Sequence, residues 1–199
     1  MTGRALCGCA AALLLVSAAA SASAGPQEVV RTVIDDGIAI LRNDGLSIDA
    51  KRVELQKMVE QHFDFETLAK LVLARGWRQL NEAERVEFTD VFKTHLSLTY
   101  SKNIEEYDDE QVEITGEQEE ARGDRTIMSR VVRPNAEDVF VNYRLRNRDG
   151  RWMMIDVVVE GVSLVSNWRA QFREVLGNES PARLIQLLRE KNDKLRTEG

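Results

Sequence analysis

The stretch that decides the fold is VFVNYRLRNRDGRWMMIDVVV, residues 139–159. In its first half, apolar and polar residues alternate, which is the pattern of a strand with one buried face. Residues 147–150, Asn-Arg-Asp-Gly, are typical of a tight hairpin turn. The second half, from Trp152 to Val159, is apolar at almost every position, so we expect it to be covered on both sides. The stretch therefore predicts an antiparallel hairpin.

The register of this hairpin follows from its apolar residues. If the turn joins Arg146 to Arg151, the apolar sets of the two strands coincide on one face. The expected partners are Leu145 with Trp152, Tyr143 with Met154, Val141 with Asp156, and Val139 with Val158.

Asp156 is the exception on that apolar face, and Glu160 follows it at even spacing. One interpretation is that Asp156 is a catalytic or ligand-binding acid. The other is a carboxylate at the end of a sheet that accepts hydrogen bonds from backbone N–H groups or from an arginine. We favour the second interpretation.

Helical periodicity precedes the strands and returns after them. Helices are expected over residues 26–41, 47–61, 65–75, 81–107 and 161–176, with a final one beginning at Ser180-Pro181. Further strands are expected from residue 111 and over residues 126–132. The order predicts an α+β fold in which helices pack on a meandering antiparallel sheet.

The N-terminus predicts an export signal. Residues 1–24 combine one charge, Arg4, with a short apolar run and the closing Ala22-Ser23-Ala24. A small residue at both ends of that tripeptide is typical of cleavage by a signal peptidase. We expect residues 1–24 to be a signal peptide and residues 25–199 to form a single domain.

Composition excludes several classes of protein. The 199 residues carry 27 basic and 33 acidic side chains, a net charge of −6, so a nucleic acid is not expected as a partner. Both cysteines, Cys7 and Cys9, lie in the predicted signal peptide. The two histidines, His62 and His95, have no metal-ligand spacing, and we expect them to be surface or packing residues. Neither a metal site nor a resident cofactor is predicted.

Ser163 is the one candidate nucleophile. Gly161-Val162-Ser163 begins like the nucleophile elbow of a hydrolase but lacks the closing glycine. A hydrolase would also need a histidine and an acid to converge on Ser163. The alternative is that its hydroxyl caps the start of a helix.

Charge is unevenly distributed along the second half of the chain. Residues 105–124 are strongly acidic, whereas arginine dominates residues 125–151. Solvated strand faces and turns explain such a pattern, and so does orientation towards charged protein partners. The sequence leaves both explanations open.

Several stretches together resemble one family. These are Phe63-Asp64-Phe65, the segment LVLARGWR at residues 71–78, the long helix that ends near Tyr100, DVVVEGVSL at residues 156–164, and Asn167-Trp168-Arg169 with Gln171-Phe172. In this order they resemble the MlaC family, also called the toluene-tolerance family, of periplasmic phospholipid-binding proteins. The resemblance covers nearly all of residues 25–199.

The resemblance implies a fold and a role. The fold would be helices packed on a curved antiparallel sheet, enclosing an apolar lipid cavity. The role would be that of a soluble periplasmic shuttle, without enzymatic activity, that carries phospholipid between the outer and inner membranes and maintains outer-membrane lipid asymmetry. The implied partners are an inner-membrane ABC transporter with an MCE-domain ring and an outer-membrane lipoprotein–porin complex. We expect the carrier to be a monomer.

The physics of such a role requires a cavity. Moving a diacyl lipid with about 30 methylenes from an apolar phase into water costs roughly 24 kcal/mol of free energy. A carrier must replace most of that burial, so its cavity should lie near the upper end of the roughly 300–1,000 Å³ range of ligand pockets, or beyond it. No cluster of inward-facing basic residues marks a phosphate site, so the head group is expected near water.

The candidate lipid-contacting residues are the apolar positions of two helices, the hairpin face and the turn that follows it: Leu68, Val72, Phe88, Phe92, Leu96, Tyr100, Val141, Tyr143, Met154, Val158 and Val162. The same pattern would also arise if these residues only closed a solid core. Two alternatives to a lipid shuttle therefore stay open. One is a periplasmic esterase or lipase-like hydrolase that uses Ser163, and the other is a lipid-free adaptor protein.

Overall fold

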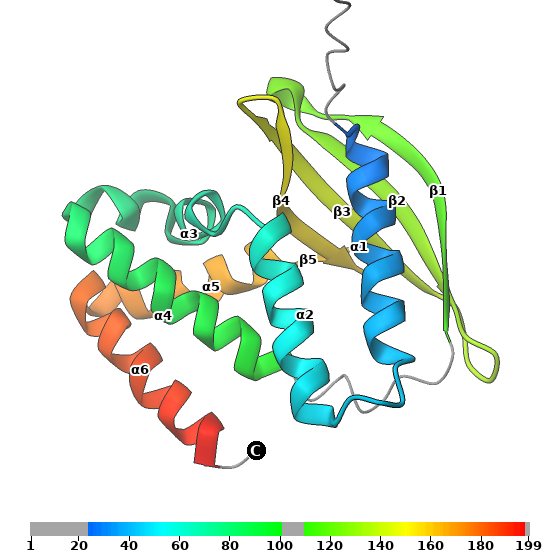
Figure 1. The fold of residues 1–199 in the computed structure, drawn as a ribbon. Coiled ribbons are helices and arrows are strands. Elements are labelled where there is room, and N and C mark those ends of the chain that lie inside the picture. Colours follow the sequence, from blue (N-terminus) through cyan, green and yellow to red (C-terminus); the bar gives the residue numbers. More distant parts are fainter. Residues whose placement is uncertain (1–23, 101–109, 198–199) are drawn as a thin grey trace, which may run out of the picture.

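Helices precede and follow a sheet along the chain in the computed structural model, which describes residues 24–100 and 110–197 (Figure 1). The first half contains helices α1 (Pro26–Leu41), α2 (Ile48–His62), α3 (Phe65–Leu73) and α4 (Glu82–Tyr100), with the 3₁₀ helix η1 (Ala74–Gln79) before α4. The second half contains strands β1 (Gln111–Glu119), β2 (Arg125–Val132), β3 (Val139–Arg148), β4 (Arg151–Val159) and β5 (Val162–Ser163), the 3₁₀ turn η3 (Ala121–Gly123), and helices α5 (Leu164–Asn178) and α6 (Pro181–Thr197). The predicted α+β class is confirmed.

The sheet is an antiparallel meander in the order β1-β2-β3-β4-β5. It curves, and α1 lies along one of its faces (Figure 1). Helices α3 to α6 form a separate group beside the sheet, and α2 lies between this group and α1 (Figure 1).

Capping residues set the helix starts where the sequence predicts them. Ser47 accepts from the Ala50 N–H at 3.2 Å at the start of α2. Asn81 and Glu84 exchange hydrogen bonds before α4, which is the reciprocal pattern of a capping box.

The predicted hairpin register is wrong. The turn is the two-residue Asp149-Gly150, which joins Arg148 to Arg151. Both turn residues have positive φ, 53° and 87°, which a two-residue hairpin turn of this kind requires. Shortening the turn from four residues to two changes every cross-strand partner predicted above.

A bulge also changes which residues of β4 share a face. Arg144 pairs with Asp156 but its neighbour Leu145 pairs with Met154, so Ile155 is an extra residue in β4. Because one inserted residue reverses the alternation of side chains, Val157 shares a face with Met154, and Val158 does not. No alternation rule applied to the sequence accounts for this insertion.

Two predicted helix boundaries are also wrong. Helix α3 ends at Leu73 instead of Arg75, and Ala74, at φ 49°, begins η1. The helix predicted from Gly161 begins at Leu164, because Glu160 and Gly161 turn with positive φ and Val162–Ser163 pair with β4 as β5. The predicted signal peptide, except Ala24, and the predicted extension of α4 to residue 107 lie outside the described residues.

The interior consists of two separate cores. The first lies among helices α3, α4, α5 and α6 and contains buried aromatic residues, among them Phe88, Phe92, Trp168 and Phe172. The second joins α1 to the sheet through Val30, Val33, Ile127, Leu145 and Met154. Phe63, between α2 and α3, packs against both cores.

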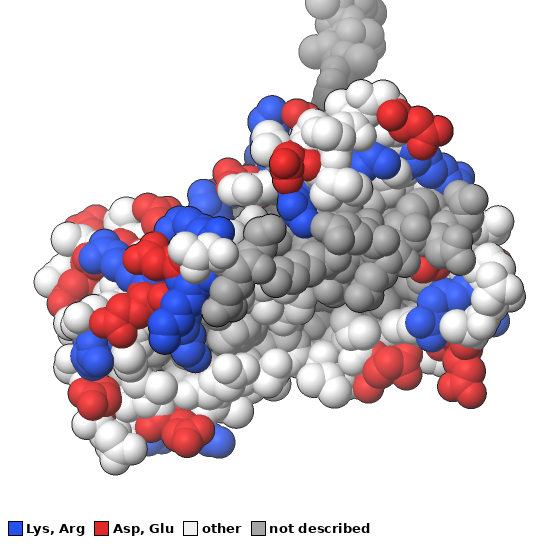
Figure 2. Space-filling model, turned by 90° about the horizontal axis from the view of Figure 1, so that it is seen from below, with Lys and Arg blue, Asp and Glu red and all other residues white. Residues whose placement is uncertain are grey.

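Acidic side chains of β1 pair with basic side chains of β2. Arg130 contacts Glu113 at 2.6 Å, and Arg125 contacts Glu119 at 2.9 Å. On the face seen from below, acidic and basic side chains lie beside one another (Figure 2). These pairs support the structural explanation of the uneven charge.

Within residues 24–100 and 110–197, no helix has the length and apolar character needed to cross a bilayer.

Candidate functional site

An apolar cavity of about 640 Å³ lies beside Phe63, the residue that packs against both cores. This volume is in the middle of the range of ligand-binding pockets and is smaller than the volume expected above for a carrier of a diacyl lipid. The walls come from α2, α3, α4, β4, β5 and α5. The apolar lining residues are Leu55, Val59, Phe63, Phe65, Leu68, Leu96, Tyr100, Val157, Val159, Val162 and Leu164.

Helix α2 forms the least buried wall of this cavity. None of its side chains is fully buried, although Leu55 and Val59 line the cavity. Leu55 and Val59 are four residues apart and therefore lie on one face of the helix. The face of α2 that carries Leu55 and Val59 therefore faces the cavity, and these side chains are not packed into either core.

The cavity contains four of the predicted lipid-contacting residues: Leu68, Leu96, Tyr100 and Val162. Tyr100 and Val162 are also exposed, at 41% and 62%, so they lie where the cavity meets solvent. These four residues come from α3, α4 and β5, and only the tertiary structure brings them together.

The other predicted residues lie outside the lining of this cavity. Val72, Phe88 and Phe92 pack in the helical core. Met154 belongs to the core between α1 and the sheet, and Tyr143 packs against that core. Val141 and Val158 are partly buried strand residues.

Sequence reasoning missed Leu55, Val59, Phe63, Phe65, Val157, Val159 and Leu164 as lining residues. The pair Leu55 and Val59 carried a usable signal, namely an apolar i, i+4 pair on one face of the helix. Val157 and Val159 carried no such signal, because the bulge at Ile155 decides which valines of β4 face the cavity.

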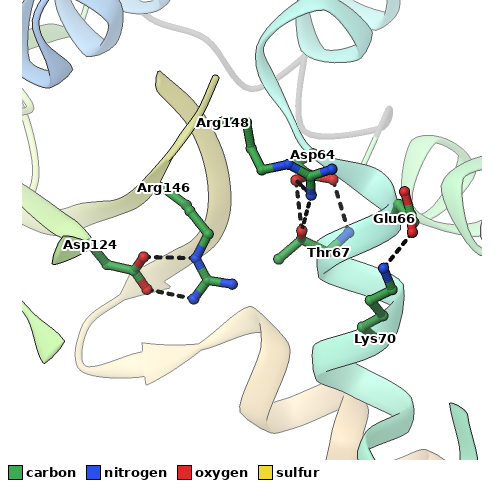
Figure 3. A network of polar contacts seen from close by, with 7 residues as sticks. All are labelled: Asp64, Glu66, Thr67, Lys70, Asp124, Arg146 and Arg148. Atoms are coloured by element: carbon green, nitrogen blue, oxygen red, sulfur yellow. Dashed lines mark hydrogen bonds and ion pairs between the residues drawn. The ribbon is translucent and has the colours of Figure 1, made fainter. Parts of the chain in front are cut away.

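A polar network fixes the segment that carries Phe63 and Phe65 (Figure 3). Asp64 lies between them and caps α3 by accepting from the Thr67 N–H at 2.9 Å. Arg148 of β3 donates to Asp64 Oδ2 at 2.8 Å and to Thr67 Oγ1 at 3.1 Å. The Asp64 N–H donates to the Met154 carbonyl at 2.9 Å. The hairpin therefore holds one wall of the cavity in place.

Beside this network, Arg146 binds Asp124 with two parallel hydrogen bonds of 2.7 Å each (Figure 3). These charge-assisted bonds raise the pKa of Arg146 above its ordinary value. The pair joins the end of β3 to the turn before β2. On the neighbouring helix α3, Lys70 pairs with Glu66 (Figure 3).

Asp156 has the structural role that we favoured. It is 3% exposed, and it accepts from the Ser163 hydroxyl at 2.6 Å and from the Val165 N–H at 3.0 Å. Ser163 in turn accepts from the Ser166 N–H at 3.0 Å and caps α5. The two residues join the start of α5, where Leu164 lines the cavity, to strand β4.

Replacing Asp156 with alanine should lower the free energy of unfolding by about 2–3 kcal/mol, because two buried donors lose their acceptor. The Ser163→Ala variant removes the cap and one of the two donors to Asp156, but leaves the Val165 N–H with its acceptor, and should cost about 1–2 kcal/mol. Urea unfolding measures both values. A smaller loss for Asp156→Ala than for Ser163→Ala would contradict the assignment.

The two histidines lie at other sites. His62 Nδ1 is 2.9 Å from the Met58 carbonyl, and His95 Nδ1 is 2.7 Å from Asn192 Oδ1. His95 is buried against Trp168, with ring centroids 4.9 Å apart. Burial lowers the pKa of His95 below its ordinary value of 6.5; the hydrogen bond to Asn192 opposes this shift, and the charge of Lys191 adds to it.

Acidification should therefore destabilise the fold through His95. As the pH falls below about 6.5, the unfolded chain binds a proton before the folded chain does, so stability is lost on the way down to the lowered pKa. The His95→Gln variant should lose less free energy of unfolding than the parent protein between about pH 8 and about pH 5.5. Urea unfolding at the two pH values measures both losses, and equal losses would contradict this assignment.

Fold and site together define a class: an α+β protein with an interior apolar cavity, in which the candidate nucleophile Ser163 serves as a helix cap. A family model described as MlaC protein matches residues 31–190. The chain therefore belongs to the MlaC family, which is a non-enzymatic family. The esterase alternative built on Ser163 is not supported.

A solved structure has the same fold. It is a phospholipid-binding protein from Ralstonia solanacearum in complex with a phospholipid. The two chains are 24% identical and superpose with a TM-score of 0.78, over 87% of this chain and 99% of that chain.

Proposed function

We propose that this protein binds phospholipid in the cavity beneath α2 and carries it through the periplasm between the outer and inner membranes. The observation that carries the proposal is the apolar lining of a cavity of about 640 Å³ beneath α2. Membership of the MlaC family and the phospholipid held by the similar Ralstonia protein support the same ligand.

The energetics favour tails inside and the head group outside. Transfer of about 30 methylenes from an apolar environment into water costs roughly 24 kcal/mol of free energy. Burial of the acyl chains therefore dominates binding. We assign tail contacts to Leu68, Leu96, Tyr100 and Val162, together with Leu55, Val59, Phe63, Phe65, Val157, Val159 and Leu164. Lipid contacts at Val72, Phe88, Phe92, Val141, Tyr143, Met154 and Val158 stay predictions.

The rest of the proposed role is supported by the family resemblance and, for export, by the pattern of the N-terminal sequence. We propose export through a signal peptide at residues 1–24 and a single carrier domain at residues 25–199. The proposed partners are an inner-membrane ABC transporter with an MCE-domain ring and an outer-membrane lipoprotein–porin complex. In this role the monomeric carrier serves to maintain the lipid asymmetry of the outer membrane.

Lipid identification tests the proposal. The chain is expressed with its own N-terminus, purified without detergent and analysed by native mass spectrometry, followed by extraction of bound lipid. We expect a population whose added mass equals that of one or more diacyl phospholipids. A protein that carries no lipid, and takes none from phospholipid vesicles, would favour the lipid-free adaptor.

A further inference from the structure

Six polar residues line the cavity. They are Arg52, Gln56 and Glu60 on α2, Lys93 and Ser97 on α4, and Asn167 on α5. The three residues of α2 are spaced by four, as are the two of α4, so each set lies along one face of its helix. We call Gln56, Glu60, Lys93 and Ser97 the α2–α4 seam.

Loose contacts close this seam. Lys93 Nζ lies 3.6 Å from Glu60 Oε2, and the Ser97 hydroxyl lies 3.4 Å from Gln56 Oε1. Both distances exceed those of ordinary hydrogen bonds. The Lys93 and Glu60 side chains are 31% and 37% exposed, so water screens their attraction. Within α2, Gln56 Nε2 also donates to Glu60 Oε1 at 2.9 Å, whereas Glu60 Oε2 has, among the described residues, only the long contact with Lys93. A ligand group that offers new partners to Lys93 and to Glu60 Oε2 can therefore enter between the two helices at little cost in free energy.

The charges at the seam are balanced, which decides the kind of ligand group that fits. Lys93 offers a cation and Glu60 offers an anion within the same contact. Arg52 lies eight residues before Glu60, about 12 Å along α2, and it donates to Asp49 at 2.9 Å. A purely anionic head group would meet Glu60 as well as Lys93 at this point.

We propose that Glu60 and Lys93 form a head-group subsite that selects zwitterionic phospholipids. Lys93 binds the phosphate anion and Glu60 binds the ammonium group of the head, while Gln56 and Ser97 offer hydrogen bonds to the ester oxygens nearby. An anionic head group without an ammonium leaves Glu60 facing the phosphate uncompensated. This inference rests on the proposed function, because the tails must occupy the cavity for the head to reach the seam.

A competition between two lipids tests the subsite. The purified protein is incubated with vesicles that contain equal amounts of phosphatidylethanolamine and phosphatidylglycerol, then separated from them, and its bound lipids are quantified by mass spectrometry. The parent protein should be enriched in phosphatidylethanolamine relative to the vesicles. In Glu60→Gln, the ratio should shift towards phosphatidylglycerol by about twofold to fivefold, the size typical of one partly exposed charge pair.

Two further variants separate local charge from other effects. The double exchange Glu60→Lys with Lys93→Glu keeps one cation and one anion at the seam and should restore the parent ratio. Glu87→Gln changes the net charge by the same amount, but Glu87 pairs with Arg189 at 2.8 Å, outside the lining of the cavity. Its ratio should equal that of the parent protein.

The outcomes distinguish the two proposals. An unchanged ratio in Glu60→Gln, an equal shift in Glu87→Gln, or bound lipid in the proportions of the vesicles would each overturn the head-group subsite while leaving lipid binding intact. The absence of bound lipid from the parent protein would overturn the proposed function itself.

Discussion

Replacing Val59 with aspartate should remove bound lipid almost completely. Val59 is partly buried on α2 and lines the apolar cavity. A carboxylate there would face the acyl chains without a partner, at a cost on the order of 3 kcal/mol, which corresponds to about a 150-fold loss of affinity. The measurement is lipid retained per protein after incubation with phospholipid vesicles.

Val53→Asp is the matched control on the same helix. Val53 is 49% exposed and lies outside the cavity lining, so the same change of side chain meets water there. We expect lipid retention equal to that of the parent protein. If both variants retained lipid fully, the wall formed by α2 would not contact the tails. If both lost it equally, the effect would come from the helix and not from the cavity.

Replacing Phe92 with alanine should give the largest loss of stability, about 3–5 kcal/mol. The Phe92 ring is 1% exposed, lies 5.6 Å from Phe88 in a stacked arrangement, and meets Phe172 and Trp168 edge-on at 5.3 and 5.7 Å. Its removal leaves a cavity and breaks three aromatic contacts. Since domains of this size have about 5–15 kcal/mol in total, the loss should be visible as a large decrease in the urea midpoint.

Val86→Ala provides the comparison within α4. Val86 is 61% exposed, so its truncation should change the free energy of unfolding by less than about 0.5 kcal/mol. Alanine is the better helix former at both positions, so helix propensity opposes a loss. A similar loss for Val86→Ala and Phe92→Ala would mean that the aromatic cluster does not set the stability of this region.

The long helix shows why its aromatic stripe was hard to interpret from sequence. Phe88, Phe92, Leu96 and Tyr100 recur every four residues and therefore share a face of α4. The structure divides this face: its first two residues pack against α5, its last two line the cavity, and Leu96 contacts both regions. Periodicity indicates that a face is covered, but whether protein or an open space covers it depends on the elements packed opposite.

The same limit applies to the polar residues. The sequence marked Asp156 as an acid among apolar residues, and the structure supplies its donors, Ser163 and Val165. Nothing in the sequence marks Glu60 and Lys93 as a pair, because they are 33 residues apart and only the packing of α2 near α4 places them at one cavity rim.

Local chemistry determined the α+β order of this protein. Capping residues, apolar periodicity and the Asp-Gly turn act within a few residues, so helices at both ends and a meandering sheet could be predicted from the chain alone. The register of the hairpin, the extra residue Ile155 in β4 and the cavity between the two cores were decided by tertiary structure. The physical reason is that a cavity forms where neighbouring helices and strands do not pack closely. The distance between two elements depends on the whole fold and is not encoded in any single segment.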